Sequence, residues 1–143
     1  MAALPPVDYR RVFKVSPTAM ALLTPGLVIL DANDEFLADI GRTREDLVGQ
    51  YVFAALPTMP PGPAGPKVTA LERALASRKR EAHELVRYDF EDPGRPGVFE
   101  ERYWTSVVTP LRGPDGRVVV LELSAREVTA IISHFRSMQA QYG

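Results

Sequence analysis

Few side chains in this sequence could do chemistry: there are two histidines, no cysteine and a few acidic pairs. The absence of cysteine excludes disulfides, thiolate zinc sites, cysteine nucleophiles and thiol adducts. His83 could ligate a haem iron only inside an apolar cavity with an axial approach to the metal. Glu100-Glu101-Arg102 and the pair Glu81 and Glu84 could serve as general acid and base, but the arginines around them favour a solvated charged surface. We therefore expect neither a catalytic residue nor a metal site.

His134 lies in the tetrapeptide Ser133-His134-Phe135-Arg136. The phosphoacceptor box of histidine kinases has an acidic residue directly after its histidine and a proline soon afterwards. Phe135 and Met138 do not fit that pattern. A solvated histidine on the polar face of a helix is therefore the preferred interpretation.

Length, composition and charge describe one ordinary globular domain. The chain has 143 residues, 45% of them hydrophobic, and a net charge of -1, which fits a single domain with an adequate core. A nearly neutral chain has no electrostatic attraction for nucleic acid or an anionic membrane. No apolar run approaches the roughly 20 residues of a membrane span, and the first residues lack the apolar core of a signal peptide. We therefore expect a cytoplasmic location.

The stretch 27–50 predicts a compact unit of one strand and two short helices. Val28-Ile29-Leu30 is an apolar, β-branched run that is typical of a buried strand. Apolar residues then recur at helical spacing as far as Gly41, which ends the first helix. Thr43 and Asp46, three residues apart, begin the second helix as a capping box.

The rest of the chain alternates between strand and helix patterns. Helical spacing predicts helices at 9–15 and 68–77, and shorter periods predict strands at 18–24, 28–32, 84–88, 99–111 and 118–123. Gly113-Pro114-Asp115-Gly116 is the clearest hairpin turn. In the last strand, Val119, Leu121 and Leu123 fall on the drier face. This order predicts an α+β fold: a five-stranded antiparallel sheet with short helices over one face.

The last residues form a separate helix with its own apolar pattern. Val128, Ile131, Phe135, Met138 and Tyr142 are spaced 3, 4, 3 and 4 residues apart, as are the a and d positions of a coiled coil. The pattern covers about two heptads, whereas a coiled coil is normally assigned from roughly three to four. Two interpretations stay open: a dimerisation seam, or a helix that docks on its own domain.

Two segments of the sequence resemble the signatures of PAS domains. ANDEFLADIGRTREDLVGQ is similar to the first signature, a strand ending in Asn and two glycine-stopped helices, through Asn33, Phe36, Gly41, Glu45, Leu47 and Gly49. RYWTSVVTPLRGPDGRVVVLEL is similar to the second, a strand with Trp that leads into a glycine turn, through Trp104, Pro110, Leu111, Gly113, Asp115 and Gly116. Glu127-Val128-Thr129 stands where many such domains have Asp-Ile-Thr. The resemblance covers residues 9–129.

The resemblance implies a bacterial sensory or regulatory module and not an enzyme. Such domains commonly stand before histidine kinases, serine phosphatases or cyclic-nucleotide enzymes. The chain then divides into a flexible lead-in at 1–8, a PAS domain at 9–128 and a C-terminal signalling or dimerisation helix at 129–143. It would be a fragment of a longer protein that carries an effector domain.

The resemblance also limits the cofactor. PAS domains that bind haem usually take the iron ligand from the helix before the strand that His83 opens, and the predicted helix at 68–77 has no histidine. The photoactive flavin class uses a cysteine adduct, which this chain cannot form. The cofactor is therefore unknown, with haem and cysteine-adduct flavin disfavoured.

A pocket between the sheet and the helices is the usual ligand site of this fold. The candidate residues come from two helices and several strands: Phe36, Ile40, Leu71, Leu75, Arg87, Tyr88, Tyr103, Trp104, Leu121 and Leu123. Arg87, Tyr88 and Tyr103 would contact an anionic or aromatic ligand. The alternative is that these residues simply fill the core. The proline-rich segment 57–66 is either a lid over that pocket or a family-typical loop insertion.

Three functions are consistent with these features. The first is a homodimeric sensor in which a small ligand biases the C-terminal helix and so controls an effector. The second is a constitutive dimerisation module with a filled core and no ligand. The third, a small cavity-containing α+β enzyme, needs a buried acid on the cavity wall, whereas the acids of this chain cluster in turns and at strand ends.

Overall fold

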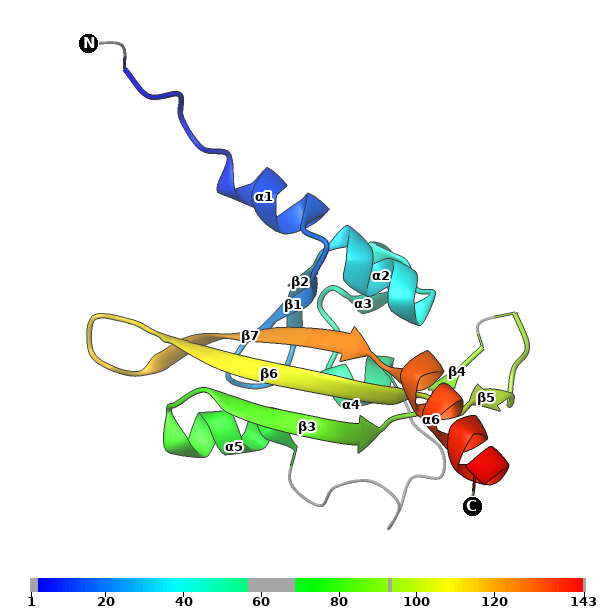
Figure 1. Ribbon diagram of the computed structural model, residues 1–143. Helices are drawn as coiled ribbons and strands as arrows, with labels where there is room; N and C mark the ends of the chain where they lie inside the picture. Colours follow the sequence, from blue (N-terminus) through cyan, green and yellow to red (C-terminus); the bar gives the residue numbers. More distant parts are fainter. Residues whose placement is uncertain (1–2, 57–68, 93, 143) are drawn as a thin grey trace.

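The protein is built on one five-stranded antiparallel sheet. The computed structural model describes residues 3–56, 69–92 and 94–142 (Figure 1). The sheet has the order β2-β1-β7-β6-β3. Its strands are β1 (Ala19–Leu23), β2 (Ile29–Ala32), β3 (Glu81–Arg87), β6 (Tyr103–Arg112) and β7 (Val118–Glu127). A separate two-stranded ribbon consists of β4 (Phe90–Glu91) and β5 (Phe99–Glu100). The predicted sheet and its α+β class are confirmed.

Short helices cover one face of this sheet (Figure 1). They are α2 (Asp34–Ile40), α3 (Arg44–Leu47), α4 (Val52–Ala55) and α5 (Ala70–Ser77). Helix α1 (Tyr9–Val15) projects beside α2, and α6 (Thr129–Tyr142) follows directly after β7. None of the helices in the described part of the chain is long and apolar enough to cross a membrane.

Hairpins and one helical crossing connect the strands, as the sequence predicts. Strands β1 and β2 form one hairpin, and β6 and β7 form another around a turn in which the Gly116 N–H donates to the Gly113 carbonyl. The helices carry the chain from β2 at one edge of the sheet to β3 at the other. The proline-rich segment 57–66 of this crossing lies outside the described residues.

The predicted strand and two short helices at 27–50 are present, although the strand is not buried throughout, because Leu30 is 42% exposed. Asn33 is fully buried and caps α2, because its Oδ1 accepts from the Phe36 N–H at 3.0 Å. The same side chain bonds to the Met20 N–H in β1 and to the Thr18 carbonyl just before that strand, so it joins helix and sheet. Gly41 ends α2 with a φ of 65°, and Thr43 opens α3 with a capping box.

The single strand predicted at 99–111 is wrong. The chain pairs with β4 as β5, leaves the ladder at Glu101 and Arg102, and begins β6 at Tyr103. At the break, the Arg102 N–H bonds to a side chain and not to a neighbouring strand. That N–H donates to the Asp89 carboxylate at 3.1 Å, and the Arg102 carbonyl accepts from the Tyr88 N–H at 2.9 Å.

The expected position of Val119 on the drier face of the last strand is also wrong. Arg112 lies opposite Val118 and Leu111 opposite Val120, so Val119 is an extra residue in β7. A β-bulge of this kind interrupts the alternation of side chains. Val118 therefore packs against the core, while Val119 is 50% exposed. Other boundaries also moved, since β3 begins at Glu81 and β7 continues to Glu127.

Candidate functional site

An aromatic cluster lies on the inner side of the sheet, next to the first residues of β6. Trp104 is 6% exposed, and its ring meets the Phe90 ring edge-on at 5.5 Å between centroids. The Trp104 indole N–H donates to the Tyr88 carbonyl at 3.0 Å. Tyr88 stacks obliquely on Phe90 at 4.9 Å and donates its hydroxyl to the Leu56 carbonyl at 2.7 Å. Burial raises the pKa of Tyr88 to about 12, so this phenol stays neutral at physiological pH.

Most residues proposed for the pocket belong to this buried side. Phe36, Ile40, Leu71, Trp104 and Leu121 are buried, and Leu75, Tyr88 and Leu123 are partly buried against the same core. Among the described residues, no buried side-chain nitrogen or oxygen lacks a hydrogen-bond partner. The structure therefore brings these eight residues together in a packed core around the aromatic cluster. The buried polar atoms of that core are hydrogen-bonded.

Arg87 and Tyr103 do not lie with that group. Tyr103 precedes Trp104 in β6, and successive strand residues point to opposite faces. Arg87 is paired across the ladder with Tyr103 and holds the buried carboxylate of Asp89 through two guanidinium nitrogens, at 2.9–3.2 Å. The three polar residues expected to share one ligand are thus divided between the two faces of the sheet.

The outer side at Tyr103 is attached to α6. The Tyr103 N–H donates to the Thr129 hydroxyl at 3.0 Å, and its carbonyl accepts from the Val128 N–H at 2.8 Å. Arg136, two turns along α6, donates to the Tyr103 hydroxyl at 2.8 Å and lies 5.1 Å from the centre of its ring. Tyr103 in turn donates to Glu101 at 2.5 Å, and Arg136 donates to the same carboxylate at 3.2 Å. We name Glu101, Tyr103 and Arg136 the helix latch.

Hydrogen bonds shift the pKa values of the latch. The bonds from Tyr103 and Arg136 hold the pKa of Glu101 below its usual value of 4.5. The hydrogen bonds of Arg136 to Tyr103 and then to Glu101 raise the pKa of Arg136. At neutral pH the latch is therefore a carboxylate and a guanidinium that share one phenol.

Helix α6 uses two different sides for two different purposes. Thr129, Ile132 and Arg136 recur at i, i+3 and i+7, and this side faces the domain, with Thr129 and Ile132 half-buried. The predicted heptad seam lies on another side. Its members Ile131, Phe135, Met138 and Tyr142 are 58%, 58%, 45% and 82% exposed, and only Val128, at the base of the helix, is half-buried. Docking on the domain and an open apolar seam therefore coexist.

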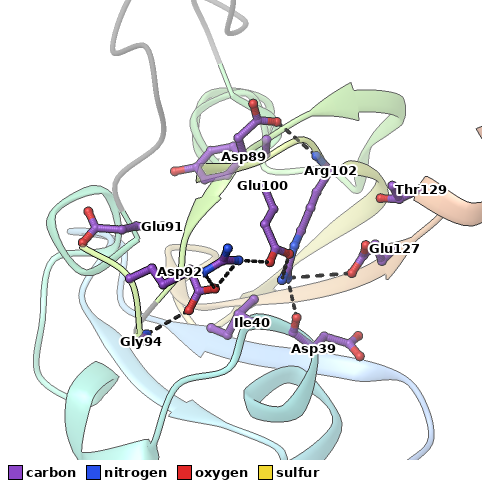
Figure 2. A network of polar contacts seen from close by, with 12 residues as sticks. Asp39, Ile40, Asp89, Glu91, Asp92, Gly94, Glu100, Arg102, Glu127 and Thr129 are labelled. Atoms are coloured by element: carbon purple, nitrogen blue, oxygen red, sulfur yellow. Dashed lines mark hydrogen bonds and ion pairs between the residues drawn. The ribbon is translucent and has the colours of Figure 1, made fainter. Parts of the chain in front are cut away.

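Arg102 connects α2 to β5 and to the end of β7 (Figure 2). Its guanidinium donates to the Asp39 carbonyl in α2 at 2.6 Å and to Glu100 in β5 at 3.0 Å. It also lies 3.8 Å from Glu127, the last residue of β7. The resemblance placed Glu127 at a family signature, and the structure shows it facing this arginine.

A surface groove of about 310 Å³ lies next to this network, between α2 and the ends of β1 and β7. It is lined by Pro17, Thr18, Ala19, Glu35, Asp39, Ala125, Arg126 and Glu127. Burial and the neighbouring Glu35 and Glu127 raise the pKa of Asp39, and Arg102 opposes them. None of the residues predicted to line a pocket takes part in this groove.

The histidines and acids do not form a reactive group in the described part of the chain. His83 bonds to Arg73 at 2.8 Å, and burial together with that guanidinium lowers its pKa. His134 is exposed on α6. Asp89 is the buried carboxylate of the described residues, and it is already bonded to Arg87 and to the Arg102 N–H. No group of three metal-ligating side chains occurs among residues 3–56, 69–92 and 94–142.

Sequence reasoning missed Arg102 and Arg136. Arg136 had a signal, since it stands seven residues after Thr129 and therefore on the same side of the helix, away from the seam. Arg102 had none, because its partners come from α2, β5 and β7 and meet only in the folded chain.

Comparisons with known proteins agree with this architecture. A family model described as a PAS fold matches residues 13–131. No curated protein is similar enough to the chain to count as a match.

Solved structures share the fold at low sequence identity. The PAS domain of nitrogen regulation protein NR(II) from Vibrio parahaemolyticus is 16% identical, with a TM-score of 0.61 over 85% of this chain and 98% of that one. A sensory box sensor histidine kinase from Vibrio cholerae is 17% identical, with a TM-score of 0.53 over 85% and 88%. A light-oxygen-voltage domain studied with a flavin analogue is 15% identical, with a TM-score of 0.59 over 96% and 97%. The family match covers the sheet, its helices and the base of α6, and so the chain belongs to the PAS family.

Proposed function

We propose that this PAS domain is a sensory or regulatory module that acts as a homodimer and controls a C-terminal effector through α6. PAS domains are generally sensory modules, and structural neighbours of this chain include a sensor histidine kinase. In this scheme the aromatic core receives the signal, and α6 passes it on. The cytoplasm and a bacterial signalling protein are the expected setting.

The exposed seam of α6 is the observation that carries the proposal. Four large apolar side chains, Ile131, Phe135, Met138 and Tyr142, stand on one side of a helix whose other side contacts the domain. Leaving such a stripe in water is unfavourable, and a coiled-coil spacing gives it a self-complementary partner. The charges of α6 do not oppose pairing, since its one arginine is bonded to Glu101. A second copy of α6 is therefore the proposed occupant.

The ligand half of the proposal rests on the aromatic cluster of Tyr88, Phe90 and Trp104. Aromatic rings beside apolar helix residues suit a small, largely apolar or aromatic ligand. Arg87 is occupied by Asp89 and is no longer the residue that we propose for an anionic group. Tyr88, whose hydroxyl reaches Leu56, is the polar candidate that remains beside the core.

Native mass spectrometry of the purified chain, followed by thermal-shift screening of metabolites, tests the ligand half. Retention of a small molecule, or a metabolite that raises the unfolding temperature of the native chain but not of Trp104→Phe, supports it. Failure of every compound supports the constitutive dimerisation module instead. That second function is favoured by the satisfied polar groups and close packing of the described core.

An enzyme of this fold would need a free acid or base at the core. Asp89 is buried, but its carboxylate is held by the Arg87 guanidinium and the Arg102 N–H. With its oxygens occupied by these donors, this carboxylate is not free to take a proton from a substrate. The geometry therefore favours the two non-enzymatic functions.

A further inference from the structure

Two consecutive residues of β6 lie between the core and α6. Trp104 faces inward, against Phe90 and the Tyr88 carbonyl. Tyr103 faces α6 and contacts it with its backbone N–H, its backbone carbonyl, its ring and its hydroxyl. One peptide unit therefore separates the packed indole from the helix latch.

The backbone and the side chain of Tyr103 contact different parts of α6. Its backbone fixes the base of the helix through Val128 and Thr129, as an extension of the β6–β7 ladder. Its side chain fixes the helix two turns further on, through Arg136. A helix that is fixed at its base and at a second point has a defined direction, whereas a helix fixed only at its base can change its direction.

The contact of Arg136 with Tyr103 and Glu101 is weaker than the backbone bonds at the base of α6. Glu101 and Arg136 are both exposed, and interactions between exposed charges are largely offset by solvent. The contact of Arg136 can therefore open without loss of the fold, while the backbone bonds at the base persist. Small displacements of Tyr103 suffice to change the balance, because its hydroxyl lies between two hydrogen-bond partners at 2.5 and 2.8 Å.

We propose that Tyr103 is the positioning residue that couples the packing of Trp104 in the core to the direction of α6, with Glu101 and Arg136 as the releasable latch on its hydroxyl. A core change that turns or shifts the indole moves the Tyr103 phenol on the opposite face and loosens Arg136. The helix then changes direction while its base stays in place. This inference rests on the proposed role of α6 as the output helix.

Fluorescence energy transfer in the native chain measures the direction of α6. Trp104 is the only tryptophan, and the sequence has no cysteine. A Gln141→Cys variant therefore takes one acceptor dye on α6, on a side away from Thr129 and Arg136. Dilution with an excess of unlabelled Trp104→Phe protein, which carries no donor, suppresses transfer between copies of a dimer. The donor lifetime distribution then reports the distance from Trp104 to the second half of α6.

Tyr103→Phe and Arg136→Gln remove the latch, and His134→Ala is the matched control on the opposite side of α6. We expect both latch variants to broaden the distance distribution and shift its mean, and the control to leave it unchanged. Phe90→Leu, which loosens the ring against Trp104, should give the same broadening in the wild-type background and no further broadening with Tyr103→Phe. Tyr88→Phe is the milder core variant, to be used in its place if Phe90→Leu unfolds.

Unchanged distributions in both latch variants would overturn the latch. Equal, additive broadening by the core variant with and without Tyr103 would overturn the coupling, because coupled residues give non-additive effects. Sedimentation of the same samples separates this inference from the proposed function. A dimer whose distance distribution does not respond to the variants contradicts only the coupling. A monomer whose distance distribution does respond contradicts only the dimeric output.

Discussion

Tyr103 and Trp104 are neighbours in β6, yet their surroundings are opposite. Trp104 is held by rings, apolar side chains and one buried hydrogen bond. Tyr103 is held by charged groups in contact with water. Apolar burial contributes stability in proportion to area, whereas exposed ionic contacts contribute little. The comparison indicates that the inner side contributes most of the stability, and in our proposal the outer side sets the direction of α6.

The largest expected effect is on the inner side, at Trp104. Trp104→Ala removes a buried ring and leaves the Tyr88 carbonyl without its donor, so we expect a loss of about 3–5 kcal/mol in the free energy of unfolding. Urea denaturation followed by circular dichroism measures it. Val119→Ala, at the exposed bulge, is the control and should change that free energy by less than about 0.5 kcal/mol. A loss at Trp104 no larger than the control's would show that the inner side is not the stabilising one.

Asn33 tests whether a buried polar contact contributes to the free energy of unfolding, as the core does, or contributes little, as we expect of the latch. Asn33→Ala leaves the N–H groups of Met20 and Phe36 and the Thr18 carbonyl without their partner. We expect a loss of about 1–3 kcal/mol, because buried groups without a partner cost their desolvation. The same denaturation experiment measures it, with the exposed ion-pair variant Asp34→Ala as control. Equal effects of the two variants would remove the distinction between buried and exposed polar contacts.

Arg136 should give the opposite result. Arg136→Gln removes the exposed contacts to Glu101 and Tyr103, and we expect no measurable change in the free energy of unfolding. Hydrogen exchange of the amides in the second half of α6 should nevertheless become faster, because local opening requires only the latch. His134→Ala should leave both quantities unchanged. A large loss of global stability in Arg136→Gln would place the latch in the folding core.

The pH dependence of the latch is the smallest effect. The pKa of Glu101 is lowered in the folded chain, so its contribution is fully present above the ordinary value of 4.5 and is lost as the pH falls through the lowered pKa. Exchange-corrected protection of α6 should therefore decrease below about pH 4.5 in the wild type. Glu101→Gln should already be less protected at neutral pH and show a weaker decrease. Parallel curves for the two proteins would exclude Glu101 as the responsible group.

The sequence was sufficient for the fold because local signals agreed with one another. Gly41 ends α2 as predicted, and Asn33 stands at the end of the strand where the resemblance placed it and caps the helix. The spacing of Ile131, Phe135 and Met138 likewise predicted an apolar side of α6. The sequence left open whether that side docks, and the structure shows that a different side, with Thr129 and Arg136, makes the contact.

The candidate site was less predictable because it depends on which face of a strand each residue occupies. Tyr103 and Trp104 were assigned to one pocket, although strand geometry places neighbours on opposite faces. The break at Arg102 depends on a bond to Asp89, which no local pattern encodes. The bulge at Val119 lies beside the β6–β7 turn and interrupts the alternation from which its face was assigned. Contacts of Arg102 with α2, β5 and β7 are of the same kind.

Sedimentation equilibrium from low to high micromolar concentration tests the central claim most directly, since that claim is that α6 presents a free seam for a second copy. The account predicts a dimer that Phe135→Asp or Ile131→Asp converts to a folded monomer, whose unfolding transition matches that of the wild type at concentrations low enough to dissociate it. Ser133→Asp, on the side of α6 away from the seam, should remain dimeric. A wild-type monomer at high micromolar concentration, or a dimer that survives both seam substitutions, would contradict the account.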